Sequence, residues 1–285
     1  MTHDHDDVHE HDLGLSHDLP TVLGRRRALG LLSAAGLAAA LAACSGGSDS
    51  STAVSPSASP SASTGATATT GSTDAGVSGE VPEETAGPFP GDGSNGVNVL
   101  TESGIVRSDL TTSFGGASGV AAGVPTTVDL TIIDMNGDSV APYAGAAIYI
   151  WHCDQEGRYS MYDDEITDEN YLRGVQVADA NGTVSFTSVF PAAYDGRWPH
   201  IHFEVYRDEA SATSATNKLR TSQIALPEDA CRDVYATSGY EASVQNMART
   251  SLDSDMVFSD GYSLQLAKAT GSAADGYRLT LNIAV

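Results

Sequence analysis

The sequence predicts an all-β fold, a β-sandwich of mainly antiparallel strands with one or two short helices. Two observations favour it. Apolar and polar residues alternate in several short segments, as in strands with one buried face, and turns rich in Gly and Asn separate these segments. The strictest alternation is at the end of the chain, in Tyr277, Leu279, Leu281, Ile283 and Val285. Many short strands joined by such turns imply a sandwich or a barrel.

The remaining elements follow in chain order. Residues 128–132 alternate and end at a turn signal, residues 134–137. Residues 147–151 are almost continuously apolar, as in a buried strand. Residues 175–189 contain two alternating runs around Asn-Gly, which predicts a β-hairpin. Residues 200–206 form the next strand, and residues 240–250 suggest a short helix.

Residues 1–44 are expected to be an export signal. Three arginines at 25–27 precede an apolar stretch at 28–43, as in a twin-arginine signal. The sequence Leu-Ala-Ala-Cys ending at Cys44 resembles the lipobox of bacterial lipoproteins, in which the cysteine is lipidated. The protein is therefore expected to be exported, as a cell-surface lipoprotein or a secreted protein. Simple cleavage without lipidation and an uncleaved anchor helix are the alternatives.

The rest of the chain divides into a tether and one domain. Residues 45–81 are Ser, Thr, Ala, Gly and Pro with almost no bulky apolar side chains, which predicts a flexible tether. Residues 82–285 are long enough for one domain with a real core. The His-rich head is expected to leave with the signal, so that only His152, His200 and His202 remain for chemistry.

The net charge of the chain limits the classes of molecule that it is expected to bind. The formal net charge is −23, and removal of residues 1–44 leaves the protein strongly acidic. Such a surface disfavours nucleic acids and other polyanions. Contact with a membrane is expected only through the N-terminal lipid anchor.

His200 and His202 are the strongest candidates for a metal site. Side chains at positions i and i+2 of a strand point to the same face, so both imidazoles can bind one ion. A cupin site needs a third histidine further along the chain, and none follows His202. Two histidines with a carboxylate remain possible. Tyr159 and Tyr194 are the other candidate ligands, because ferric iron readily deprotonates a phenol.

Six short motifs occur across the predicted domain, at residues 84–89, 151–154, 157–160, 191–194, 197–203 and 221–224. Together they resemble the intradiol ring-cleavage dioxygenases, which include the catechol and protocatechuate dioxygenases. The resemblance covers nearly the whole predicted domain and is closest to the secreted short forms.

This resemblance implies a β-sandwich that holds non-haem Fe(III) and cleaves small aromatic diols with O2 to cis,cis-muconate products. The implied ligands are Tyr159, Tyr194, His200 and His202, with Tyr162 as the alternative to Tyr159. Tyr194 would leave the metal when substrate binds and accept a substrate proton. The resemblance further implies that Arg197 stabilises developing negative charge and that Gln223 assists by hydrogen bonding.

The remaining points concern the cysteines, a competing function and what the sequence leaves open. Cys153 and Cys231 form an even pair in an oxidising compartment, which predicts one disulfide, with two buried free thiols as the alternative. The competing function is a surface-tethered module that binds carbohydrate or an aromatic polymer without catalysis. The sequence leaves the particular catechol and the oligomeric state open.

Overall fold

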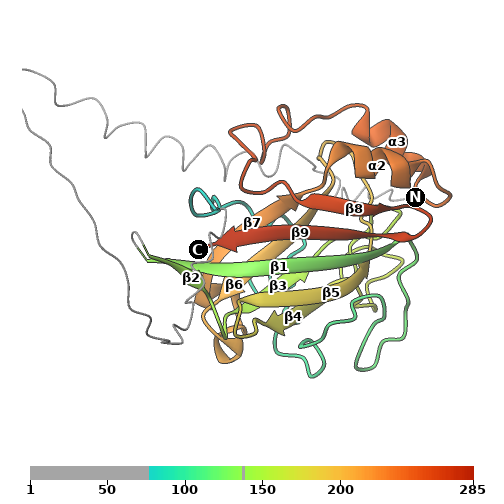
Figure 1. The fold of residues 1–285 in the computed structure, drawn as a ribbon. Coiled ribbons are helices and arrows are strands. Elements are labelled where there is room, and N and C mark those ends of the chain that lie inside the picture. Colours follow the sequence, from blue (N-terminus) through green and yellow to red (C-terminus); the bar gives the residue numbers. More distant parts are fainter. Residues whose placement is uncertain (1–76, 137–138) are drawn as a thin grey trace, which may run out of the picture. The chain divides into compact units, whose positions relative to one another are not determined.

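A computed structural model describes residues 77–136 and 139–285 of the chain. In these ranges two β-sheets face each other, and two short α-helices lie together near the edge strand β8 (Figure 1). The strands are β1 (Pro125–Asn136), β2 (Ser139–Pro142), β3 (Ala147–Trp151), β4 (Arg173–Val177), β5 (Thr183–Val189), β6 (His200–Tyr206), β7 (Lys218–Ala225), β8 (Lys268–Ser272) and β9 (Gly276–Ala284). The helices are α2 (Glu228–Tyr235) and α3 (Glu241–Met247), with 3-10 turns η2 (Glu209–Ser211) and η3 (Ala215–Asn217).

The pairing of the strands confirms the predicted fold class. One sheet has the order β2-β1-β9-β8, and the other has the order β4-β3-β6-β7. Strand β1 is long enough that β5 pairs with its first part and β2 with its last part. The pairing of β1 with β9 is parallel, and the other pairs are antiparallel. The described chain is therefore a mainly antiparallel sandwich.

Strand β6 lies in the interior of its sheet, between β3 and β7. All seven of its residues are buried, including the polar His200, His202 and Glu204. The apolar Ile201, Phe203 and the other residues of that face join the hydrophobic core. Because successive side chains point to opposite faces, the polar residues share the second face of the strand. That face is also covered, so their polar atoms need partners within the protein.

The predicted hairpin over residues 175–189 is wrong. The Asn-Gly turn exists, with Gly182 at φ 76° and Asp179 and Thr183 hydrogen-bonded across it. The strands on either side separate, however: β4 pairs with β3 in one sheet and β5 pairs with β1 in the other. The turn therefore connects the two layers of the sandwich. Local turn chemistry does not specify which partner each strand finds.

The helices and the start of the domain differ slightly from expectation. Helix α3 lies within the predicted residues 240–250, whereas α2 has no counterpart among the segments expected to be helical. Val81, assigned to the tether, is 1% exposed, and its amide donates to the carbonyl of Ala284. The ordered domain therefore begins before residue 82, because this segment extends alongside the last strand. The export signal, Cys44 and the tether up to residue 76 lie outside the described residues.

No helix in the described ranges is long and apolar enough to cross a membrane.

Candidate metal centre

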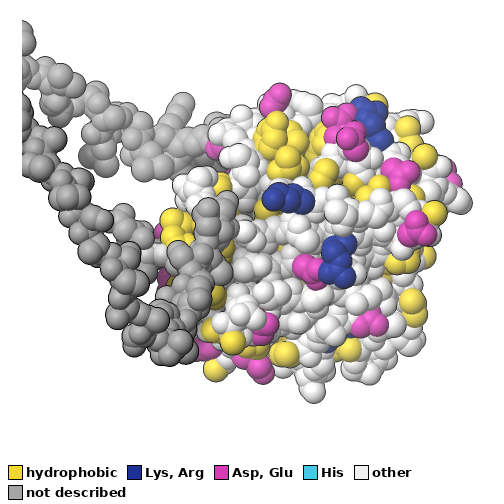
Figure 2. Space-filling model, viewed as in Figure 1, with side chains coloured by type: hydrophobic (Ala, Val, Ile, Leu, Met, Phe, Trp, Pro, Cys, Tyr) yellow, Lys and Arg dark blue, Asp and Glu magenta, His cyan; other side chains and the backbone are white. Residues whose placement is uncertain are grey.

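The candidate centre begins with the two histidines of β6. His200 and His202 are 2% and 3% exposed, and their Nε2 atoms lie 3.0 Å apart. The ring of His202 stacks on the Trp151 ring at 4.9 Å between centroids. Among the described residues, no histidine shows on the molecular face drawn in Figure 2, in keeping with this burial. The predicted convergence of the two imidazoles on one point is therefore present.

The surroundings of the histidines favour neutral rings with available lone pairs. Burial, followed by the positive charge of Arg197, lowers the pKa of His200 to about 3. Burial likewise holds the pKa of His202 well below its usual value. His200 Nδ1 lies 2.5 Å from the carbonyl oxygen of Trp198, which accepts hydrogen bonds only. The proton of His200 is therefore assigned to Nδ1, which leaves a lone pair on Nε2.

Two tyrosines complete the cluster from two different loops. Tyr194 lies between β5 and β6, and its hydroxyl oxygen is 3.0 Å from His200 Nε2. Tyr159 lies in the loop after β3, and its hydroxyl oxygen is 3.5 Å from that of Tyr194. Burial raises the pKa of Tyr194 to about 12 and that of Tyr159 well above its usual value. Both side chains are therefore phenols at neutral pH unless a cation displaces their protons.

This donor set fits a strongly acidic cation. Among the described residues, no group of three or more His, Cys, Asp and Glu side chains could hold a metal ion. The cluster instead offers two neutral imidazoles and two phenols. Only a hard, acidic ion such as Fe(III) deprotonates phenols of raised pKa at neutral pH and also accepts imidazole nitrogen. The residues present therefore fit ferric iron.

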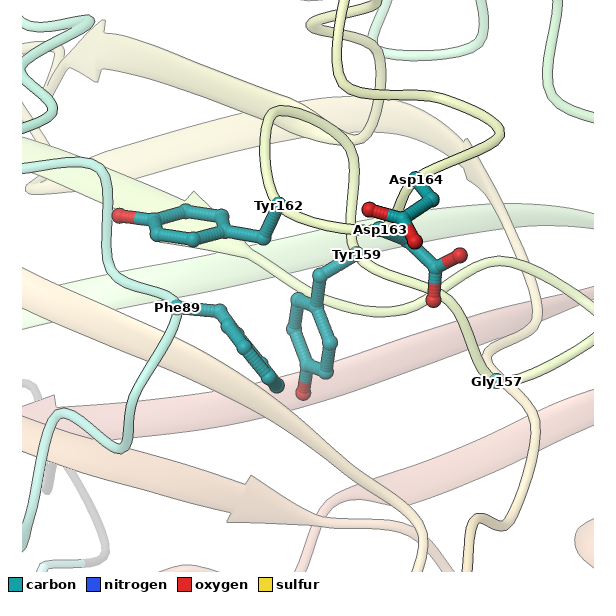
Figure 3. Close-up of a pocket in the computed structure, with 6 residues that line it drawn as sticks. All are labelled: Phe89, Gly157, Tyr159, Tyr162, Asp163 and Asp164. Carbon is teal, nitrogen blue, oxygen red and sulfur yellow. The ribbon is translucent and has the colours of Figure 1, made fainter. Parts of the chain in front are cut away.

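Tyr162, the alternative ligand, does not join the cluster. Its hydroxyl donates to Asn95 Oδ1 at 2.9 Å and accepts from the amide of Gly91 at 2.8 Å. Figure 3 shows its hydroxyl pointing away from that of Tyr159. The ring of Phe89 packs against both tyrosines, 5.0 Å from the Tyr159 ring and 5.2 Å from the Tyr162 ring. Tyr162 therefore helps to form the wall of the site.

Arg197 and Gln223 lie beside the cluster and contact each other. Arg197 is 6% exposed, and its Nη2 donates to Gln223 Oε1 at 2.6 Å. Gln223 lies opposite His202 in the pairing of β6 with β7, and its Nε2 donates to the carbonyl of Thr85. The guanidinium charge is thus fixed in the interior close to the phenols. Residues 84–89 close over this side, where a side chain at Gly87 would lie 3.3 Å from the His202 ring.

Asp255 is a site residue that sequence reasoning missed. Its carboxylate accepts from Arg197 Nε at 2.9 Å and from the amide of Trp198 at 2.7 Å, and it is fully buried. Burial acts to raise its pKa, but the charge of Arg197, together with the hydrogen bonds from Arg197 and from the Trp198 amide, outweighs this effect, and the pKa is lowered. Asp255 is one of 37 acidic residues and lies 58 positions from Arg197, so no local pattern distinguishes it.

The predicted disulfide is wrong for this structure, in which Cys153 and Cys231 are both free, buried thiols. Cys153 Sγ instead donates weakly to the carbonyl of Ala192, and burial raises the pKa of both thiols.

His152 is not part of the cluster either. Its two nitrogens contact the carbonyl of Cys153 and the hydroxyl of Ser188, which leaves neither for a metal.

A pocket adjoins the cluster on the side of Tyr159 (Figure 3). It is a cavity of about 120 Å³, small for a polymer but suited to one small molecule. Its lining residues are Phe89, Gly157, Tyr159, Tyr162, Asp163 and Asp164. Gly157 has φ 89° and faces Tyr194 so closely that an added Cβ would lie 3.3 Å from Tyr194 Cβ. The Tyr159 ring is thus both a wall of the pocket and part of the cluster.

Comparison with known proteins finds similarity to dioxygenases. The family model described as Dioxygenase matches residues 101–236. A chlorocatechol 1,2-dioxygenase from Pseudomonas sp. (strain P51) is 35% identical over 89 residues, which are 25% of this chain and 35% of that protein. A catechol 1,2-dioxygenase from Pseudomonas sp. (strain EST1001) is 42% identical over 53 residues, 19% of this chain and 17% of that one. The match thus spans about a third or less of the length of these curated relatives.

Among solved structures, an intradiol ring-cleavage dioxygenase from Tetranychus urticae superposes with a TM-score of 0.57 at 26% identity. The superposition covers 72% of this chain and 94% of that one.

Proposed function

We propose that this chain is a member of the intradiol ring-cleavage dioxygenase family, a family of oxidoreductases, and that it uses Fe(III) to cleave a small catechol with O2. Cleavage would occur between the two hydroxylated carbons and give a cis,cis-muconate product. We also propose that the protein acts outside the cell, as a lipoprotein attached through Cys44 or as a secreted protein.

The observation that supports this proposal most strongly is the convergence of four donor atoms. Tyr159 and Tyr194 would hold the iron through oxygen, and His200 and His202 through Nε2. Bound Fe(III) would supply the Lewis acidity that makes phenol and catechol hydroxyls lose their protons. A protein that only bound carbohydrate or an aromatic polymer would not need two phenols and two imidazoles within hydrogen-bonding distance in a closed interior.

The protein's own residues would then handle protons and charge. Tyr194 lies in the loop between β5 and β6. Its phenolate oxygen would accept a proton from a catechol hydroxyl when the substrate takes its place at the iron. Arg197, held by Asp255 and Gln223, places a fixed cation where the substrate gains negative charge. Residues 84–89, which include Phe89, lie against the Tyr159 and His202 rings and would limit the access of water to the site.

The first test is colour and iron content. Tyrosinate bound to ferric iron absorbs visible light, so the purified, iron-loaded protein is expected to be red to burgundy with one iron per chain. Tyr194→Phe should shift this absorption and abolish oxygen uptake with catechols. Tyr143→Phe is a matched control, because Tyr143 lies between β2 and β3, outside the cluster. A protein that stays colourless after iron reconstitution would count against the proposal.

The second test identifies the product. Oxygen uptake with a set of catechols, followed by mass spectrometry and nuclear magnetic resonance, should show muconates that carry both oxygen atoms of O2. Products of cleavage next to the two hydroxyls, rather than between them, would show that the proposed reaction is wrong even if iron is bound.

A further inference from the structure

The pocket beside Tyr159 has an unusual distribution of charge. Its aromatic walls are Phe89, Tyr159 and Tyr162, and the charged side chains that line it are the carboxylates of Asp163 and Asp164. In Figure 3 the two carboxylates lie together on one side of the Tyr159 ring, opposite Phe89 and Tyr162. Asp164 is exposed and Asp163 is half-buried, so both sit where the pocket meets solvent.

Neighbouring cations do not neutralise this edge. Arg158, the adjacent guanidinium, is already surrounded by carboxylates: Asp154 at 2.9 Å, Glu156 at 3.2 Å and Glu165 at 2.7 Å. Arg173 is 1% exposed and lies behind the wall of the pocket, its guanidinium carbon 5.3 Å from the centre of the Tyr162 ring.

Arg173 is also fully engaged where it is. Its nitrogens donate to the hydroxyl and carbonyl of Ser160, to the carbonyl of Pro90 and to the hydroxyl of Tyr149. It cannot reach a ligand in the pocket without breaking these bonds. A ligand in the pocket therefore meets two carboxylates and, among the lining residues, no cation.

We propose that this acidic edge selects the substrate: the enzyme acts on catechols whose ring substituent is neutral or positively charged and discriminates against catechols that carry a carboxylate. This inference rests on the proposed function, since it assigns the pocket to the substrate ring. The diol must face the cluster of tyrosines and histidines, so a substituent on the opposite side of the ring extends towards the solvent edge formed by Asp163 and Asp164.

The physical basis is Coulomb interaction across a partly solvated distance. Two carboxylates within a few ångströms of a substituent attract a cation and repel an anion, and each unit of substrate charge changes affinity by roughly five- to tenfold. An anionic substituent would need a basic partner at this position, and the pocket offers acidic ones. The aromatic walls favour the uncharged ring itself.

The test uses three catechols of similar size that differ in the charge of the substituent at ring position 4: 4-ethylcatechol, dopamine and 3,4-dihydroxyphenylacetate. For the iron-loaded enzyme, kcat/KM should be highest for dopamine, intermediate for the neutral compound and lowest for the carboxylate. High salt should compress this order. Values that are equal for all three compounds, or highest for the carboxylate, would overturn the inference.

The decisive variant is the double substitution Asp163→Asn with Asp164→Asn. Asn preserves side-chain size, and Asp163 contributes its backbone amide and carbonyl to the hydrogen bonds of the loop, so the loop should keep its shape. The variant should raise kcat/KM for the carboxylate relative to dopamine by about tenfold or more. A matched control, Asp134→Asn with Asp229→Asn, removes two exposed carboxylates that do not line the pocket and should leave the order unchanged. An unchanged order in the pocket variant would refute the assignment.

A separate readout distinguishes failure of this inference from failure of the proposed function. The three catechols are also titrated into the iron-loaded protein without oxygen, and binding is followed through the visible absorption. If no catechol is opened but the charge order appears in binding and disappears in the pocket variant, the function is wrong and the inference holds. If catechols are opened without any charge order, the function holds and the inference is wrong. Absence of both opening and binding overturns both.

Discussion

Replacing Asp255 with Asn keeps the shape of the side chain and removes its charge. In the structure this carboxylate accepts from Arg197 Nε at 2.9 Å, from the Trp198 amide at 2.7 Å and from the Val257 amide at 2.8 Å. An Asn side chain has a single acceptor oxygen, so its NH2 group would face a donor that now lacks a partner. Arg197 would also become a buried cation without a counter-charge.

The expected loss of stability follows from these contacts. A charge-assisted hydrogen bond contributes about 1.5–3 kcal/mol, and leaving a buried amide without an acceptor costs about 1–3 kcal/mol. Removing the charge of one partner of a buried ion pair typically costs about 3–5 kcal/mol of stability. We therefore expect Asp255→Asn to lower the free energy of unfolding by about 3–5 kcal/mol, a large part of the stability of an ordinary domain. The rate of ring opening should fall as well, because Arg197 loses one of the groups that fix its position.

The assay is urea unfolding of the wild type, Asp255→Asn, Arg197→Met and the double variant, with Asp229→Asn as the exposed control. Because the two residues share one interaction, the double variant should be less destabilised than the sum of the single changes by about 2 kcal/mol. Two results would refute the reasoning: a loss below about 1 kcal/mol in Asp255→Asn, or additivity within about 0.5 kcal/mol in the cycle.

Two further predictions concern protons. Since burial raises the pKa of Tyr159 and Tyr194, Fe(III) must displace two phenol protons when it binds. The affinity of the protein for Fe(III), measured by chelator competition, should therefore rise by about two decades per pH unit near neutrality. An affinity that does not change with pH would contradict this donor set. Burial, followed by the negative charge of Asp92, raises the pKa of Glu204 to about 7. The protonated Glu204 therefore contributes fully to the stability of the fold below about pH 4.5, and this contribution is lost as the pH rises through 7. Glu204→Gln should therefore gain up to about 3 kcal/mol relative to the wild type between pH 5 and pH 8, as measured by urea unfolding at both values, and an unchanged difference would be evidence against it.

Local patterns in the sequence predicted much of the fold and the centre of the candidate site. Alternation of apolar residues identified most strands, because a strand with one buried face requires period two. The spacing of His200 and His202 placed both imidazoles on one face for the same geometric reason. The family motifs named Tyr159, Tyr194, Arg197 and Gln223, and the structure brings these side chains to the same region.

The wrong predictions share one cause. The Asn-Gly turn at residues 181–182 forms as expected, but the two strands it joins pair with partners in different sheets. Cys153 and Cys231 were paired because of their number and compartment, and their thiols remain separate in the folded chain. Turn residues and the number of cysteines carry no information about long-range contacts, whereas the pairing of strands and of cysteines depends on which surfaces meet in the folded chain.

By itself, the sequence determined the strand periodicity and the pair of histidines on β6, since these depend on neighbours within a few positions. Only the tertiary structure decided that Tyr159 rather than Tyr162 approaches the histidines, that Asp255 fixes Arg197 from 58 positions away, and that Asp163 and Asp164 form the edge of the pocket. These contacts join loops that are distant in the chain. They form when the two sheets pack and the loops close over β6, a step that no short-range pattern encodes.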